Sequence, residues 1–229
     1  MSKGLHTGHR KRMKQKYLKD NFDNMNHHEA LEMLLYYAIP QRDTNPLAHE
    51  LIERFGSLSA VFDASIASLI DFGLTENVAI LIKSIPDFAR LYLDDKQESR
   101  SKEIMPDELP EFFQTKFVGR TDEALYCLLM DGNFKQIRCE LLSKGSFTST
   151  DVPIRRIVEL ALMYKAKFVA ISHNHPLGMS IPSKADLDAT QAIYKTLSGM
   201  GVVLVDHVII SATDYTSLAN TSFGKHIFV

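Results

Sequence analysis

The stretch that decides the fold is Lys167-Phe-Val-Ala-Ile-Ser-His-Asn-His-Pro-Leu-Gly-Met-Ser-Ile-Pro-Ser-Lys-Ala-Asp186. Its first six residues, 167–172, form a short apolar run that is typical of a buried β-strand. Pro176 and Gly178 follow, and residues of these types end a strand and turn the chain. Ser183 then begins a segment with helical spacing, so the stretch predicts a strand, a turn and a helix.

The sequence on both sides of this stretch alternates between strand and helix patterns. Upstream, two apolar runs flank the turn signal Asp131-Gly-Asn133, which predicts a β-hairpin. Downstream, a β-branched run predicts a long strand. The predicted elements are strands 123–130 and 134–142, helix 152–164, strand 167–172, helix 183–197 and strand 201–210. This order favours a mixed α/β sheet covered by helices.

The first half of the chain has the pattern of short helices. Apolar residues recur at helical spacing, and Asn26, Pro40 and Gly56 stand where helices begin or end. The predicted helices are 27–37, 47–55, 57–62, 65–70, 77–85 and 86–93. Short helices joined by tight turns are typical of a small helical bundle.

A polar segment separates the two halves. Residues 94–103 contain no large apolar side chain, and Pro106 and Pro110 follow them. Such a composition does not form a core and is typical of a linker. We therefore predict a helical domain at 1–93, a charged linker at 94–106 and an α/β domain at 107–229.

The composition is that of an ordinary soluble globular protein. Of 229 residues, 45% are hydrophobic and 24% are charged, which excludes disorder throughout. No apolar run approaches the roughly 18 residues needed to cross a bilayer, and the start of the chain is not a secretory signal. Two cysteines cannot form a disulfide framework. We expect a cytoplasmic protein without membrane contact.

Two histidines and one carboxylate in the opening stretch have the spacing of metal ligands. Residues i and i+2 of a strand project from the same face, so His173 and His175 point the same way. Asp186 lies one turn into the following helix. Two imidazoles and a carboxylate, with a fourth position for water, suit one catalytic zinc ion per chain, although iron, manganese and nickel also accept these ligands. Ser183 and Asp186 are equally a helix-capping pair, and the two interpretations are compatible.

The same residues carry a resemblance to a known family. The pattern His-x-His-x7-Ser-x2-Asp resembles the JAB/MPN+ (JAMM) metalloprotease domain, and His-Asn-His-Pro-x-Gly resembles the RadC family (UPF0758). The resemblance implies an α/β protein with a small helix-hairpin-helix-like domain and a C-terminal JAB/MPN (cytidine deaminase-like) domain. Leu177 departs from it, because the family usually has Ser there. Further segments that resemble RadC are 8–12, 40–44, 54–58, 144–146 and 205–209.

The resemblance implies a zinc-dependent hydrolase of peptide or isopeptide bonds. In that domain a Glu at the start of the first core strand is the general base, which matches Glu123. Glu140, on the second hairpin strand, is the rival. Ser183 would hydrogen-bond the oxyanion. Asp206-His207, on the last long strand, either supplies a hydrogen bond to a ligand imidazole from behind or is a buried polar pair satisfied by the backbone; we favour the second interpretation.

The N-terminal half gives weaker indications of nucleic-acid contact. Residues 1–20 hold seven basic side chains and one acid, a charge that suits phosphates. Residues 51–85 resemble a helix-hairpin-helix module, but Thr75 replaces its second Gly and Glu76 is acidic. Through the basic residues 3–19 and this module, the chain would contact nucleic acid, and the family label links it to DNA repair. A metal-dependent nuclease, a DNA-binding repair factor and a non-catalytic scaffold remain the alternatives, and the oligomeric state is open.

Overall fold

The computed structural model of the protein describes residues 8–98, 103–145 and 153–228. It divides into two compact units between Phe88 and Ala89, inside helix α6 (Glu76–Glu98). The helix therefore includes residues 94–98 of the predicted linker, of which 99–102 lie outside the described residues. The predicted domain boundaries stay a prediction. Among the described helices, none has the length and apolar character of a membrane span.

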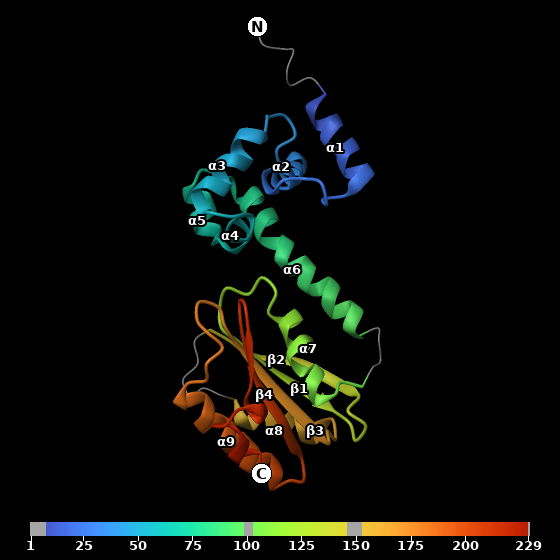
Figure 1. The fold of residues 1–229 in the computed structure, drawn as a ribbon, viewed down its shortest axis with the longest axis vertical. Helices are drawn as coiled ribbons and strands as arrows, with labels where there is room; N and C mark the ends of the chain where they lie inside the picture. The colour runs from blue at the N-terminus through green and yellow to red at the C-terminus, as the bar shows by residue number, and fades with distance from the viewer. Residues whose placement is uncertain (1–7, 99–102, 146–152, 229) are drawn as a thin grey trace. The chain divides into compact units, whose positions relative to one another are not determined.

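The first unit is helical, as predicted (Figure 1). Ser57 and Ser65 cap two of its short helices by accepting from the backbone N–H groups three residues later. Apolar side chains such as Leu31, Leu51 and Ile82 form its core. Before α6, the helices of this unit are α1 (His9–Asp20), α2 (His27–Ala38), α3 (Asn45–Phe55), α4 (Leu58–Asp63) and α5 (Ile66–Asp71).

Helix α6 corrects one expectation. The sequence predicts separate helices at 77–85 and 86–93, because Pro86 favours a helix start. The structure has one continuous helix with Pro86 inside it. Both halves are anchored, since Ile82 is fully buried in the first unit and Asp94 pairs with Lys116 at 2.8 Å in the second. Such contacts offset the backbone hydrogen bond that a proline cannot donate.

The second unit is a mixed five-stranded sheet with helices on both faces, which confirms the predicted α/β architecture. The strand order is β2-β1-β3-β4-β5, with only the β3–β4 pair parallel. Helix α7 and strand β5 were not among the elements that the sequence predicts. The strands are β1 (Ala124–Met130), β2 (Gln136–Lys144), β3 (Phe168–His175), β4 (Val203–Ser211) and β5 (Tyr215–Ser217).

Helices α8 (Ile154–Met163) and α9 (Lys184–Ser198) cover one face of the sheet and α7 (Leu109–Lys116) covers the other. Residue 152, the predicted start of α8, lies outside the described residues. The alternating side chains of β3 supply both cores: Val169 and Ile171 contact the α8–α9 side, and Ala170 contacts the α7 side. Because β3 and β4 are parallel, α9 crosses between them and its N-terminus follows the end of β3.

Candidate metal centre

The two histidines lie at the carboxyl end of the central strand. His173 and His175 have the parity of Val169 and Ile171, so they project toward the face covered by α9. The strand ends at His175, and Pro176 and Gly178 lie in the turn that follows, as predicted. Asp186 stands in the first turn of α9, whose N-terminus stabilises a carboxylate.

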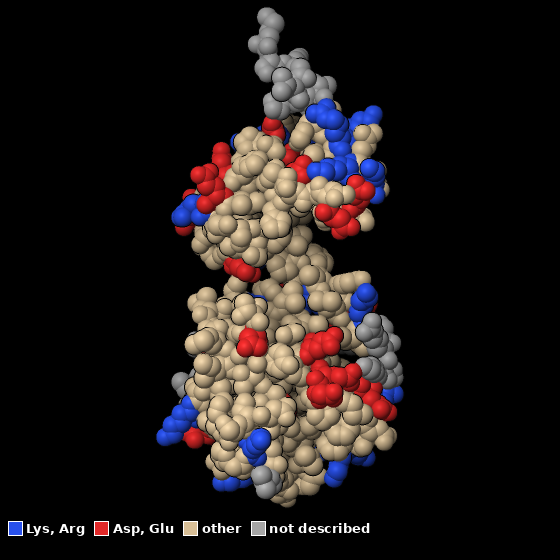
Figure 2. Space-filling view, in the orientation of Figure 1, with Lys and Arg blue, Asp and Glu red and all other residues tan. Residues whose placement is uncertain are grey.

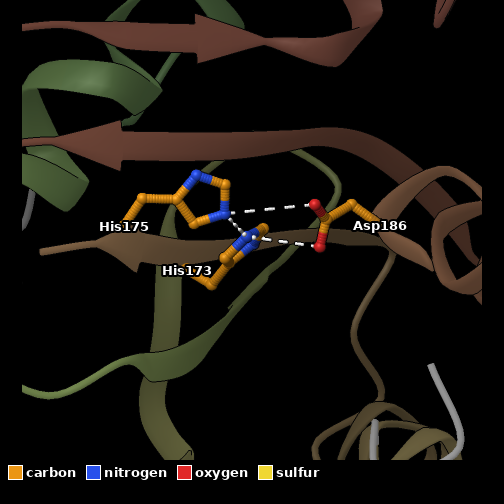
Figure 3. Close-up of side chains that lie close together, drawn as sticks. All are labelled: His173, His175 and Asp186. Atoms are coloured by element: carbon orange, nitrogen blue, oxygen red, sulfur yellow. Dashed lines mark hydrogen bonds and ion pairs between the residues drawn. The ribbon is translucent and has the colours of Figure 1, made fainter. Parts of the chain in front are cut away.

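These three side chains form a cluster (Figure 3). Their ligand atoms lie within 4.8 Å of one another. His173 Nε2 is 2.9 Å from His175 Nε2 and 3.3 Å from Asp186 Oδ1, and His175 Nε2 is 4.0 Å from Asp186 Oδ2. Among the described residues no other group of three His, Cys, Asp or Glu has this geometry.

The helix cap holds the carboxylate in place. Asp186 Oδ2 accepts from the backbone N–H and the hydroxyl of Ser183, both at 2.7 Å, and Ser183 Oγ accepts from Asp186 N–H at 3.1 Å. Burial raises the pKa of Asp186, but His173 and the Ser183 hydrogen bonds outweigh it and hold that pKa below its ordinary value. The predicted capping pair is thus present, and it leaves Asp186 Oδ1 facing His173.

The donor set of the cluster fits a cation. His175 Nδ1 lies 2.8 Å from the carbonyl oxygen of Met179, which can only accept, so Nδ1 carries the proton and Nε2 the lone pair. Burial lowers the pKa of His173 to about 4, so its imidazole is neutral near pH 7. Neutral imidazole nitrogen and carboxylate oxygen suit zinc, iron, manganese or nickel, and the cluster leaves that choice open.

A cleft of about 430 Å³ adjoins the cluster and includes the predicted base. Glu123 and His175 both line it, together with Thr121, Asp122, Gly145, Pro176, Leu177 and Gly178. The backbone on either side of Glu123 is held by Asn174, whose side chain accepts from Ala124 N–H at 2.7 Å and donates to Asp122 C=O at 3.1 Å. Sequence reasoning missed Asn174, although its place between the two ligands was a signal that it faces the opposite side.

The rival base occupies a different environment. Glu140 accepts from Arg138 Nε and Arg156 Nη2, each at 2.6 Å. In the strand register it lies opposite Cys127, which in turn lies opposite Ile171, and β1 separates its strand from β3. Both cysteines are free thiols.

The two interpretations of Asp206 and His207 each hold for one residue. Asp206 accepts from the backbone N–H of His207 and of Ala219, and from Ser217 Oγ, so it is a satisfied buried carboxylate. His207 Nε2 lies 2.8 Å from His173 Nδ1, so it supports the imidazole of a candidate ligand from behind. For His207 the favoured prediction was wrong, because the sequence does not show that β4 lies directly beside β3.

Some basic residues of the N-terminal segment bond to other parts of the helical unit, and others are exposed to solvent. Figure 2 shows Lys and Arg gathered over α1. Arg10 donates to the carbonyl oxygens of Ile39, Pro40 and Arg42, which end α2 and begin the next turn. Lys16 pairs with Glu29 at 2.7 Å. Lys11, Arg12 and Lys14 are exposed, and Lys3 lies outside the described residues.

The hairpin between α5 and α6 belongs to a module with more acidic than basic side chains. Gly73 has a φ of +112°, a left-handed conformation that lets the chain turn there. Residues 51–85 contain four carboxylates (Glu53, Asp63, Asp71 and Glu76) and two basic residues, Arg54 and Lys83. Lys83 donates to the carbonyl oxygens of Phe62 and Asp63.

Comparison with known proteins identifies relatives of this chain. A family model described as the RadC-like JAB domain matches residues 87–223. A UPF0758 protein of Fusobacterium nucleatum is 32% identical over 226 residues, which cover 95% of this chain and 97% of the relative. A UPF0758 protein of Paraburkholderia xenovorans is 31% identical, over 85% of this chain and 78% of the relative. One of Cupriavidus taiwanensis is 29% identical, over 92% of each. The fold, the cluster and these matches together show that the chain belongs to the RadC-like JAB domain family.

Proposed function

We propose that the chain is a metal-dependent hydrolase that cleaves peptide or isopeptide bonds. The observation that carries the proposal is the convergence of three candidate ligand atoms, from His173, His175 and Asp186, beside a cleft that His175 and Glu123 both line. Zinc is the ion we favour, one per chain, because two imidazoles and a carboxylate leave a fourth tetrahedral position open.

Each residue then has a distinct role. His173, His175 and Asp186 would hold a divalent ion, which would lower the pKa of a bound water to about 7 and polarise a carbonyl oxygen. Glu123 takes the proton of the attacking water and delivers it to the leaving amine. Ser183 donates to the oxyanion only if its hydroxyl releases Asp186 Oδ2, which it binds at 2.7 Å.

The surroundings of the cleft favour a peptide over a phosphodiester. Among the described residues its lining contains two carboxylates, Asp122 and Glu123, and no Lys or Arg that would bind a phosphate. In the loop after β3, Leu177 is fully exposed, and Met179 and Ile181 are mostly exposed. Ser180 between them is buried and bonded to Thr216, so the loop is held with its apolar side chains outward. Exposed apolar side chains beside a site suit an apolar segment of a protein substrate.

The test is hydrolysis by the zinc-loaded full chain of fluorogenic peptides, isopeptide-linked peptides, and single-stranded, duplex and branched DNA. We expect cleavage of at least one peptide class, and a fall in kcat of about 10²–10⁴-fold in Glu123→Gln with zinc content unchanged. Glu140→Gln is the matched control and should keep full activity. Glu123-dependent cleavage of DNA alone would instead establish the nuclease. Cleavage of neither by zinc-loaded protein would leave the scaffold alternative.

We also propose that α1 contacts nucleic acid, a function that the exposed Lys11, Arg12 and Lys14 support. Phosphate contacts release counterions, so the logarithm of affinity should fall with the logarithm of salt concentration. Replacing Lys11 and Lys14 by Ala should reduce that slope by about 2. If these substitutions leave the salt dependence of affinity unchanged, α1 is excluded as a nucleic-acid contact surface.

A further inference from the structure

Two buried residues connect one metal ligand to another. Thr190 on α9 is fully buried, and His207 on β4 is 3% exposed. Thr190 Oγ1 lies 2.5 Å from the backbone carbonyl oxygen of Asp186 and 2.6 Å from His207 Nδ1. His207 Nε2 in turn lies 2.8 Å from His173 Nδ1. An unbroken chain of hydrogen bonds therefore runs from the backbone of Asp186 to the imidazole of His173.

The direction of this chain is fixed at one end. A carbonyl oxygen can only accept, so the single hydroxyl proton of Thr190 points at Asp186 C=O. Thr190 Oγ1 then accepts from His207 Nδ1–H. A neutral imidazole has one N–H, so His207 Nε2 holds a lone pair and accepts from His173 Nδ1–H. The remaining nitrogen of His173, Nε2, is left with a lone pair directed at His175 and Asp186.

The opposite direction has two faults. If the Thr190 hydroxyl donated to His207, Thr190 Oγ1 and the carbonyl oxygen of Asp186 would lie 2.5 Å apart with no proton between them. The protons would then shift along the chain until His173 carried one on Nε2, the atom that must be deprotonated to bind a metal. Because Thr190 and His207 are buried, water does not replace the lost partners.

We infer that Thr190 and His207 are positioning residues that hold His173 in the Nδ1–H tautomer, with Nε2 ready for a metal. His175 reaches the same tautomer independently, through the carbonyl of Met179. This inference rests on the metal site of the proposed function. It does not require that the chain hydrolyses anything, so its test is separate from that of the hydrolase.

The direct test is the tautomer of His173 in the metal-free full chain. Two-bond ¹H–¹⁵N correlation spectra of protein labelled at histidine nitrogens distinguish Nδ1–H from Nε2–H imidazoles, with His173→Gln used for assignment. We expect His173 as Nδ1–H in wild type. In Thr190→Val, His207 loses its acceptor, and we expect His173 to shift to Nε2–H. A wild-type His173 in the Nε2–H form would overturn the inference.

The second readout is zinc affinity, measured by competition with a chromophoric chelator. Thr190→Val should weaken binding about 10–100-fold, as the loss of supporting hydrogen bonds does at other sites. Thr190→Ser keeps the hydroxyl and should stay within about 3-fold of wild type. Thr196→Val is the matched control, because Thr196 donates to Ala192 C=O on the same helix but is exposed and contacts no ligand. Equal zinc affinity in Thr190→Val and Thr196→Val would refute the role of Thr190. If Thr190→Val fails to fold, the tautomer of His173 in the wild-type spectrum still tests the inference.

Discussion

Each unit of the molecule contains a partly buried cluster of histidine and carboxylate, and the two clusters differ in their hydrogen-bond donors. In the helical unit, Glu32 is fully buried and accepts from Tyr36 Oη at 2.6 Å, from Asn45 Nδ2 at 2.9 Å and from His9 Nε2 at 2.9 Å. Burial and the Glu32 carboxylate raise the pKa of Tyr36, which keeps its hydroxyl proton. Every contact there joins a donor to an acceptor.

In the α/β unit the corresponding atoms are acceptors that face one another. His175 Nε2 and Asp186 Oδ1 hold lone pairs, and we infer the same for His173 Nε2. Converging lone pairs repel, and a cation relieves that repulsion. The comparison shows that a histidine near a carboxylate indicates a metal site only when the neighbouring hydrogen-bond donors are bonded to other acceptors.

The largest expected difference between the clusters is in metal content. Asp186→Ala should lose the bound ion entirely, because the site loses its carboxylate and its charge. Glu32→Ala should keep about one ion per chain, as in wild type. Elemental mass spectrometry after dialysis against a mild chelator, with zinc then offered back, measures both. Equal metal content in wild type and Asp186→Ala would contradict the proposed site.

The reverse difference is expected in stability. Glu32→Ala leaves three buried or half-buried donors without their acceptor, which costs about 2–4 kcal/mol. Hydrogen exchange of the α2 and α3 amides measures the local free energy of unfolding. Glu53→Ala, an exposed carboxylate on α3, should change it by less than about 0.5 kcal/mol. Similar exchange in the two variants would show that the Glu32 cluster does not stabilise the unit.

A smaller effect concerns the apolar loop beside the metal cluster. Replacing Leu177 and Met179 together by Ser should raise KM for an apolar peptide about 5–50-fold, with kcat little changed, because only ground-state contacts are lost. Met163→Ser removes an exposed methionine from α8 and should leave KM unchanged. A fall in kcat alone would mean that the loop does not bind substrate.

The smallest effect should appear at Glu140. Burial raises its pKa, but the hydrogen bonds from Arg156 and Arg138 outweigh it, so the pKa lies below the ordinary 4.5. The folded state therefore binds the proton less readily than the unfolded state, and the ion pairs stabilise the fold above pH 4.5 and cease to do so as the pH falls through the folded pKa. Because these pairs are exposed to solvent, Glu140→Gln should cost less than about 1 kcal/mol at pH 7. Thermal unfolding measured from pH 3 to pH 7 should show the difference in stability between wild type and Glu140→Gln disappearing at low pH. A difference that stays constant over this range would contradict the prediction.

The local sequence pattern was sufficient to predict an element wherever the contacts that determine it are close in sequence. The apolar run, the turn residues Pro176 and Gly178, and the Ser183–Asp186 cap all act within one strand–turn–helix unit. The sequence therefore predicted β3, α9 and the places of His173, His175 and Asp186 in them. Local pattern failed at α6, where contacts on each side of Pro86 continue a helix that propensity would interrupt.

What the sequence by itself determined is a helical region, a mixed α/β sheet and a candidate ligand set, His-x-His plus Asp. Only the tertiary structure decided which side chains surround those three residues. His207 reaches His173 across 34 residues, and Asn174 reaches Asp122, beside Glu123, across 52. Such contacts depend on strand order and register, which one sequence does not specify, because the same alternating pattern permits several arrangements of strands.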